Sequence, residues 1–415
     1  MDLKPLFEGA LEASRVLNLM EQSKIDAVLQ SLADAAEANS ERILRANEMD
    51  LIRMERSNPL YDRLLLTEDR IKGIANDLRS VSTLNSPVAE ELSHVKRPNG
   101  MEIRKVRVPF GVIGVIYEAR PNVSFDVFGL CFKSSNACVL KGGSDAHNSN
   151  VAIVEIIREV LRAEGVDERV VTLLPPDREA TAQLLAAEGY VDLLIPRGSS
   201  SLINYVRHNA SIPVIETGAG ICHTYVEQSA DVEKARAIVT NAKTRRVSVC
   251  NALDCLVIDA SRVGDLSEIC ADLAKKSVVI YADELSYGVL SASYPSELLE
   301  AADEDSYGTE FLDYKMSIKC VRGQEEAMAH ITQNTSHHSE TIVTEDMAAA
   351  QRFLRVIDAA CVYHNVSTAF TDGGQFGFGA EIGISTQKLH ARGPMALPEL
   401  TTYKYLITGN GQVRD

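Results

Sequence analysis

The first part of the chain carries the apolar spacing of amphipathic helices. Apolar residues recur every three or four positions in segments 23–38 and 40–55. Each segment opens on a Ser, a residue type that suits a helix N-cap. The pattern predicts helices over residues 1 to about 90, and packing accounts for them without any chemistry.

The pattern changes over residues 101–122. Basic and apolar residues alternate up to Val108, a Pro-Phe-Gly break follows, and residues 112–117 are continuously apolar. Alternation is typical of a two-sided strand, whereas a continuous apolar run indicates a strand buried on both faces. We therefore expect a hairpin arm over about 95–110, followed by a buried strand.

From residue 137 onward, short apolar strands alternate with polar turns and helical segments. The strands are expected within residues 137–143, 169–175, 190–196 and 212–220. Strands separated by helices imply right-handed crossovers and a mainly parallel sheet. This α/β architecture is typical of nucleotide-binding proteins, although a fold alone does not establish a ligand.

A second α/β segment covers residues 226–365. Helical patterns lie at 231–244 and 351–360, and strands are expected within 255–259, 277–281 and 360–365. A Gly-rich stretch over 371–386 predicts a long loop, and residues 401–410 predict a terminal strand.

The net charge of the chain limits the classes of partner that it is expected to bind. The 415 residues include 58 acidic and 42 basic side chains, a formal net charge of −16, and no Trp. Without a long basic block, this balance argues against nucleic acid and against an anionic membrane. The N-terminus lacks a signal-peptide pattern, and no stretch approaches about 18 uninterrupted apolar residues. We expect a soluble intracellular protein.

The eight cysteines are scattered, without a Cys-x-x-Cys pair or a Cys/His run of zinc spacing. We therefore expect reduced thiols in a cytoplasmic protein, and no metal site.

Two turns between a strand and a helix are candidate phosphate sites. Lys141, Gly142, Gly143 and Ser144 lie where backbone N–H groups and the helix dipole attract an anion. Glycine in such a turn is also common without any ligand, and neither the Gly-x-Gly-x-x-Gly nor the Walker pattern is present.

The second turn contains Arg197, Gly198 and Ser199, followed by two further serines. Taken alone, this turn is explained slightly better by a plain Ser N-cap. Two such turns at adjacent strand ends favour a dinucleotide more than either turn does alone.

Two further residues could react. Glu216 ends an apolar stretch before two glycines, where it could be a general base or a solvated turn residue. Cys250 could be a nucleophile, a metal ligand or a small buried residue. Its polar neighbours Ser248 and Asn251, with two arginines close by in the chain, favour a reactive thiolate.

Several segments together resemble the aldehyde dehydrogenase superfamily, and within it the glutamate-5-semialdehyde dehydrogenase family. The segments are VPFGVIGVIYEARPNV, LKGGSDAHNSN, PVIETGAGICHTYV, NAKTRRVSVCNALDCLVI, EFLDYKMSIK and AEIGISTQKLHARGPMALPELTTYKY. The resemblance runs from about residue 100 to the C-terminus. It implies an α/β fold with a Rossmann-type cofactor domain, a catalytic domain and a small oligomerisation element.

The resemblance also implies a reaction. Cys250 is expected to attack the acyl phosphate of L-glutamyl 5-phosphate, expel phosphate and leave a thioester, which NADPH then reduces to L-glutamate 5-semialdehyde. Asn122 matches the superfamily's oxyanion-stabilising Asn. Glu216 matches its general base, whose role stays open here because water would waste the acyl phosphate.

Cofactor residues follow from the same resemblance. Lys141 matches the lysine that binds the adenosine ribose, and Glu310 the glutamate that holds the nicotinamide ribose. Ser144, where many relatives carry an acidic residue, leaves room for the 2′-phosphate of NADP(H).

The chain departs from the family pattern at two places. It carries Ser199–Ser201 in place of a Gly-rich run and Val247 in place of a Pro. The substrate carboxylate or phosphate could meet His223, Lys388 or Arg392, each of which could equally be a surface or interface residue.

We expect an NADP-binding domain over 1–225, a catalytic domain over 226–370, and a return segment with an oligomerisation strand over 371–415. The arm would leave an exposed strand edge, which predicts a dimer or tetramer. Association with glutamate 5-kinase is a further expectation.

Two other functions compete with this one. The first is a hydrolytic NAD(P)-dependent aldehyde dehydrogenase that acts on a small aldehyde and needs Glu216 to activate water. The second is a non-catalytic relative that binds the kinase. The intact set of Cys250, Asn122 and Lys141 argues against the second.

Overall fold

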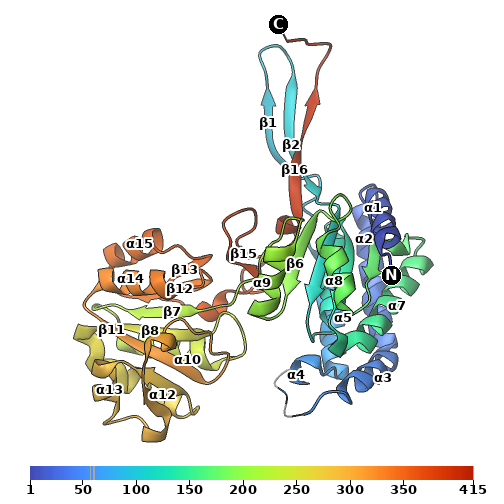
Figure 1. Cartoon of the computed structure of the whole chain (residues 1–415). Helices are drawn as coiled ribbons and strands as arrows, with labels where there is room; N and C mark the ends of the chain where they lie inside the picture. Colours follow the sequence, from blue (N-terminus) through green and yellow to red (C-terminus); the bar gives the residue numbers. More distant parts are fainter. Residues whose placement is uncertain (57, 59–60, 415) are drawn as a thin grey trace. The chain divides into compact units, whose positions relative to one another are not determined.

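The computed structural model describes residues 1–56, 58 and 61–414, which form two compact units. Unit 1 comprises 1–217, 377–383 and 395–415, and unit 2 comprises 218–376 and 384–394. Each unit contains its own parallel sheet with helices, which confirms the α/β class (Figure 1).

The N-terminal part of unit 1 is helical, as predicted. Its helices are α1 (Lys4–Leu17), α2 (Gln22–Ala38), α3 (Ser40–Leu51), α4 (Tyr61–Leu64) and α5 (Glu68–Thr83). The predicted serine caps are wrong, because α2 and α3 are preceded by Glu21 and Asn39. Ser23 and Ser40 lie inside the first turns, where a side chain no longer occupies the capping position.

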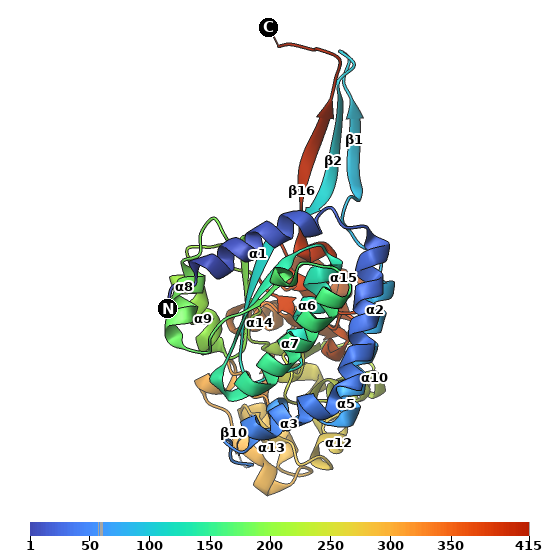
Figure 2. The ribbon, with the colours of Figure 1, turned by 90° about the vertical axis from the view of Figure 1, so that its right-hand side faces the viewer.

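The sheet of unit 1 is four-stranded and parallel, in the order β5-β4-β3-β6. Its strands are β3 (Val112–Tyr117), β4 (Ala137–Gly142), β5 (Val171–Leu173) and β6 (Leu193–Arg197). Its helices are α6 (Val123–Lys133), α7 (His147–Ala163), α8 (Arg178–Leu185) and α9 (Ser200–Asn209). Figure 2 shows α6 and α7 running across this part of the unit.

Burial in this sheet follows the sequence pattern. Every residue of β3 and β4 is buried, as expected for continuous apolar strands covered on both faces. The strand predicted within 212–220 is reduced to an isolated bridge between Val214 and Leu194. Pro213 lacks the N–H that a continuing ladder would need.

An antiparallel sheet of three strands, which we call the arm, also belongs to unit 1. It consists of β1 (Glu91–Lys96), β2 (Glu102–Pro109) and β16 (Thr401–Thr408), with β2 in the middle. All of β1 and most of β16 are exposed. Figures 1 and 2 show the arm extending away from the helices of unit 1.

The sheet of unit 2 has seven parallel strands in the order β10-β9-β11-β8-β7-β12-β13. They are β7 (Cys222–Val226), β8 (Leu253–Asp259), β9 (Val279–Ala282), β10 (Leu299–Ala301), β11 (Lys315–Val321), β12 (Ser339–Val343) and β13 (Cys361–His364). A small antiparallel pair, β14 (Ile384–Ser385) with β15 (Gly393–Pro394), completes the unit's strands.

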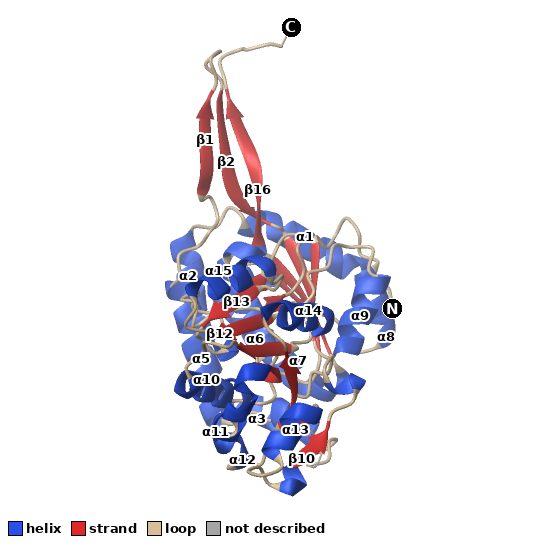
Figure 3. Cartoon of the chain, turned by 90° about the vertical axis from the view of Figure 1, so that its left-hand side faces the viewer, coloured by secondary structure: helices blue, strands red, loops and turns tan. Residues whose placement is uncertain are grey.

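Helices cover both faces of this sheet. One face carries α10 (Val232–Thr244), α11 (Leu266–Ile269), α12 (Ala271–Ala274) and α13 (Glu284–Leu290), and the other carries α14 (Gln324–Asn334) and α15 (Met347–Val356). Figure 3 shows α14 and α15 beside β12 and β13.

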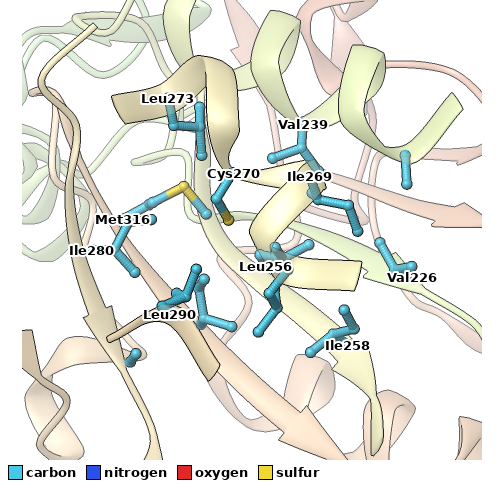
Figure 4. Packing of buried hydrophobic residues seen from close by; sticks show 14 of the residues in the cluster. Val226, Val239, Leu256, Ile258, Ile269, Cys270, Leu273, Ile280, Leu290 and Met316 are labelled. Atoms are coloured by element: carbon cyan, nitrogen blue, oxygen red, sulfur yellow. The ribbon is translucent and has the colours of Figure 1, made fainter. Parts of the chain in front are cut away.

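The larger apolar core of unit 2 lies under α10–α13. Figure 4 shows Leu256 and Ile258 of β8 packed with Ile269, Cys270 and Leu273, all fully buried. Burying each Leu or Ile side chain contributes about 1.5–3 kcal/mol. This core gives β8, and the loop that precedes it, a rigid base.

The division of the chain differs from the predicted boundaries at 225 and 370. Unit 1 ends its first segment at Thr217, because β7 pairs with β8 and β12 and thus belongs to the second sheet. The C-terminal segment is shared between the units, since 384–394 lie in unit 2 and 395–415 in unit 1.

Asn136 ties together three parts of unit 1, and we predict that Asn136→Ala lowers the free energy of unfolding by about 2–4 kcal/mol. Its side chain accepts from the Gly111 N–H (2.9 Å) and donates to the Leu400 carbonyl (2.9 Å). Each buried group left unpaired costs about 1–3 kcal/mol. Urea denaturation measures the change. Asn209→Ala, at an exposed position, is the control. It should change the free energy of unfolding by less than about 0.5 kcal/mol.

Candidate active site

Cys250 differs from the other seven cysteines, all of which are buried, because it is partly exposed. It lies in the loop between α10 and β8, which the core beneath β8 holds in place. Its Sγ is 3.1 Å from Nε2 of His338, the residue immediately before β12. A thiol and an imidazole at this distance can exchange a proton.

The hydrogen bond at Nδ1 of His338 determines whether Nε2 is a donor or an acceptor. Nδ1 lies 2.8 Å from the Ser339 hydroxyl, which lies 2.6 Å from the Thr371 hydroxyl. When Ser339 donates to Thr371, it accepts from His338 Nδ1–H, and this assignment leaves Nε2 as the acceptor that faces Cys250. The Tyr363 hydroxyl, 2.7 Å from Thr371, extends the chain.

Burial controls the charge of this histidine. His338 is fully buried, and desolvation lowers its pKa to about 4. The imidazole is therefore neutral near pH 7 and able to accept the thiol's proton. Sequence reasoning missed His338. The adjacent histidines at 337–338 were the available signal, but they did not identify a partner 88 positions away.

Gly220 brings a predicted cofactor residue close to Cys250. Its N–H donates to Glu310 Oε1 at 2.8 Å. A Cβ on Gly220 would overlap the Cys250 carbonyl, so only glycine allows this approach. Within unit 2, Glu310 and Cys250 thus both lie next to Gly220.

The turn after β4 in unit 1 joins a strand end to a helix start, and its binding of a phosphate or ribose stays a prediction. Lys141 and Gly142 end the strand, Gly143 follows, and Ser144 begins a 3₁₀ turn that leads into α7. The Lys141 ammonium donates to the carbonyls of Pro176 (3.0 Å) and Gly142 (3.2 Å). Burial lowers its pKa, yet the group sits at the strand end as a fixed donor.

The turn after β6 differs from the expectation. Ser199 caps α9, and its N–H donates to the Glu118 carboxylate at 2.8 Å. A carboxylate, rather than a phosphate, thus occupies this helix N-terminus. Arg197 donates to the Ile382 carbonyl, and Gly198 lies against Glu118. The two turns are also not on adjacent strands, because β3 lies between β4 and β6.

Asn122 and Glu216 belong to unit 1, whereas Cys250 belongs to unit 2. Asn122 donates to Asp126 at 2.8 Å, and burial raises the pKa of Asp126 to about 6. Glu216 lies 3.6 Å from Arg207. Their approach to the Cys250 thiol stays a prediction.

The three candidate substrate-binding residues all lie in unit 2 and all have partners. Lys388 and Arg392 both pair with Asp358, at 2.6 and 2.8 Å. His223 is fully buried and lies 3.0 Å from Glu340. Arg392 Nε and Nη2 and His223 Nε2 are buried without a hydrogen-bond partner, so these two side chains keep donor or acceptor capacity beside their existing partners.

Comparisons with known proteins establish the family of the chain. The aldehyde dehydrogenase family matches residues 1–288, and the chain belongs to that family. It is 62% identical to the gamma-glutamyl phosphate reductase of Parabacteroides distasonis over 414 residues, covering 100% of both chains. It is 60% identical to that of Bacteroides thetaiotaomicron, covering 100% of this chain and 99% of the other.

Solved structures point the same way. The crystal structure of the Thermotoga maritima gamma-glutamyl phosphate reductase superposes with a TM-score of 0.95 at 40% identity over 100% of both chains. An acetylating aldehyde dehydrogenase of Geobacillus thermoglucosidasius shares the fold, with a TM-score of 0.69 at 18% identity over 100% of this chain and 97% of the other. The resemblance predicted from the sequence segments is confirmed, and the family implies a nicotinamide cofactor.

We predict that Gly220→Ala lowers the free energy of unfolding by about 1–3 kcal/mol, because the added methyl displaces the Cys250 carbonyl. Gly264→Ala is the matched control, since nothing lies within 4 Å of a Cβ there. Thermal and urea unfolding of both variants measure the difference. Equal stability of the two would contradict the close approach of Gly220 to Cys250.

Proposed function

We propose that the chain reduces L-glutamyl 5-phosphate to L-glutamate 5-semialdehyde with release of phosphate, as a phosphorylating, NADP-dependent dehydrogenase of proline biosynthesis. The observation that carries the proposal is the 3.1 Å contact between Cys250 Sγ and His338 Nε2. It occurs in a chain that aligns over its full length with gamma-glutamyl phosphate reductases.

In the first step His338 Nε2 takes the proton of the Cys250 thiol as the sulfur attacks the acyl carbon. A carbon–sulfur bond forms, the carbon–oxygen bond to phosphate breaks, and the enzyme holds a thioester. The Ser339 hydroxyl, 2.8 Å from His338 Nδ1, stabilises the imidazolium that results. Asn122 and the Cys250 N–H are the proposed donors to the carbonyl oxygen as its negative charge develops.

The second step reduces the thioester. NADPH, when bound, supplies a hydride to the carbonyl carbon. Collapse of the resulting hemithioacetal breaks the carbon–sulfur bond, and His338 returns its proton to the departing thiolate. The released phosphate takes its proton from solvent. Glu216 has no required part in this sequence, because no water molecule attacks.

The residues proposed for the cofactor come from both units. Lys141 and Ser144 would hold the ribose and the 2′-phosphate, with Gly142 and Gly143 letting the backbone approach the ligand. Glu310 would hold the nicotinamide ribose. Binding a pyrophosphate at Arg197, Gly198 and Ser199 would require Glu118 to release the Ser199 N–H.

The proposal also covers the oligomeric state, the partner and the cellular location of the protein. The exposed side chains of β16 include Tyr403, Tyr405 and Ile407, on a strand whose outer edge is unpaired within the described chain. Such an edge favours pairing with another subunit in a dimer or tetramer. A functional association with glutamate 5-kinase would protect a labile acyl phosphate. No helix among the described residues is long and apolar enough to span a membrane; we propose a cytoplasmic location.

The reverse reaction tests the proposal directly. We expect the purified protein to reduce NADP with glutamate semialdehyde only when inorganic phosphate is present, since phosphate must release the acyl group from Cys250. Cys250→Ser should lose this turnover, whereas the buried Cys270→Ser should keep it. Absorbance of the reduced nicotinamide is the measurement. Turnover without phosphate would instead favour the hydrolytic dehydrogenase with Glu216 as its base.

The role of His338 predicts a pH profile. Because the pKa of His338 is lowered to about 4, it stays neutral, and kcat/KM should not fall through its protonation between pH 8 and pH 5. His338→Gln should lose about 10²–10⁴-fold at pH 7, the usual contribution of a general base. The loss of kcat/KM in His338→Gln should become smaller as the pH approaches about 8.5, the ordinary pKa of a thiol, because hydroxide then forms the thiolate without the histidine.

His337→Gln is the control for the preceding experiment, because its side chain is exposed and bonds to the Asp358 carbonyl instead. A deficit of His338→Gln that is the same at every pH would show a purely structural role. Unchanged activity of that variant would remove His338 from the mechanism.

A further inference from the structure

A second group of histidine and cysteine side chains lies inside unit 2, and the reaction described above does not use it. His223, Cys255 and His330 each offer one ligand atom, and these atoms all lie within 4.8 Å of one another. Imidazole nitrogen and thiolate sulfur are the ligands that zinc and similar borderline cations select.

The fold brings these residues together from three elements. His223 on β7 and Cys255 on β8 are direct partners in the parallel register, and His330 comes from α14 on the same face. Cys255 Sγ lies 3.7 Å from His330 Nε2. Cys255 belongs to the apolar cluster beneath α14 and α15, which holds its side chain in place.

One nitrogen of this group has no partner. His223 is fully buried, and its Nε2 forms no hydrogen bond in the structure. Its other nitrogen, Nδ1, lies 3.0 Å from the Glu340 carboxylate, which also accepts from the His223 N–H at 2.9 Å. A carboxylate on Nδ1 fixes the ring and directs the Nε2 lone pair toward a metal, as in carboxylate–histidine–zinc sites.

We propose that His223, Cys255 and His330 bind a single borderline cation of the zinc type, with a water in the fourth position and Glu340 orienting His223. The charges balance, since the Cys255 thiolate and the Glu340 carboxylate together offset a divalent ion. The ion would link α14 to β7 and β8, which makes it a structural element separate from the Cys250 chemistry.

The spacing of the cysteines predicted no metal site, because each ligand comes from a different part of the chain. The parallel register of β7 with β8 and the position of α14 bring the three side chains together, which no local spacing shows.

Cobalt titration of the full-length, chelator-stripped protein tests the site without reference to activity. We expect a near-ultraviolet thiolate-to-cobalt absorption band that saturates at one equivalent of Co²⁺ and disappears on adding Zn²⁺. Cys255→Ser should abolish the band, and His330→Gln should weaken binding strongly. Glu340→Gln should weaken it by about 10–100-fold, the usual effect of losing an orienting carboxylate.

Two control variants test whether the cobalt absorption band arises from this site. Cys270→Ser, in the core on the other face of the sheet, should leave the band unchanged. Cys250→Ser should also leave it unchanged, which separates this proposal from the fate of the proposed function. Absence of a saturable band, its survival in Cys255→Ser, or its loss in Cys250→Ser would each overturn the site. Circular dichroism establishes that every variant is folded.

Discussion

The parallel pairing of β7 with β8 on one side and β12 on the other is the constraint on which unit 2 depends. In this register His223 stands opposite both Cys255 and Glu340. A slip of one residue in a strand would move every side chain to the opposite face. Both cysteine–histidine groups would then be lost together.

Side-chain bonds hold that register. Glu340 accepts from the backbone N–H and the ring of His223, which joins β12 to β7 one residue beyond Ser339. The Cys222 thiol donates to the Cys250 carbonyl at 3.2 Å, which ties the reactive loop to the start of β7. His338, directly before β12, thereby meets the Cys250 thiol in the loop that leads into β8.

The cysteines of unit 2 differ in their exposure according to where they lie relative to the sheet. Burial raises the pKa of Cys222 well above its usual range and that of Cys270 to about 12, so these two thiols stay protonated. Cys250 is partly exposed and has an imidazole beside it. Reactivity in this unit follows from position relative to the sheet rather than from the residue type alone.

Much of this could be predicted from local pattern. Amphipathic spacing defined the N-terminal helices, and continuous apolar runs defined β3 and β4, because helix and strand periods are local properties. Cys250 stood out through its polar neighbours. What escaped prediction depends on residues distant in the chain: His338 beside Cys250, and Glu118 at the start of α9. The place of β7 in the second sheet likewise needed partners that no local pattern specifies.

The neutral state of His338 suits the substrate. His338 is fully buried, so its charged form carries a desolvation penalty, and its pKa is lowered to about 4. In the mechanism we propose, the imidazole is therefore uncharged until it takes the proton of the attacking thiol. An acyl phosphate is already an activated electrophile, so this mechanism does not require a thiolate before the attack.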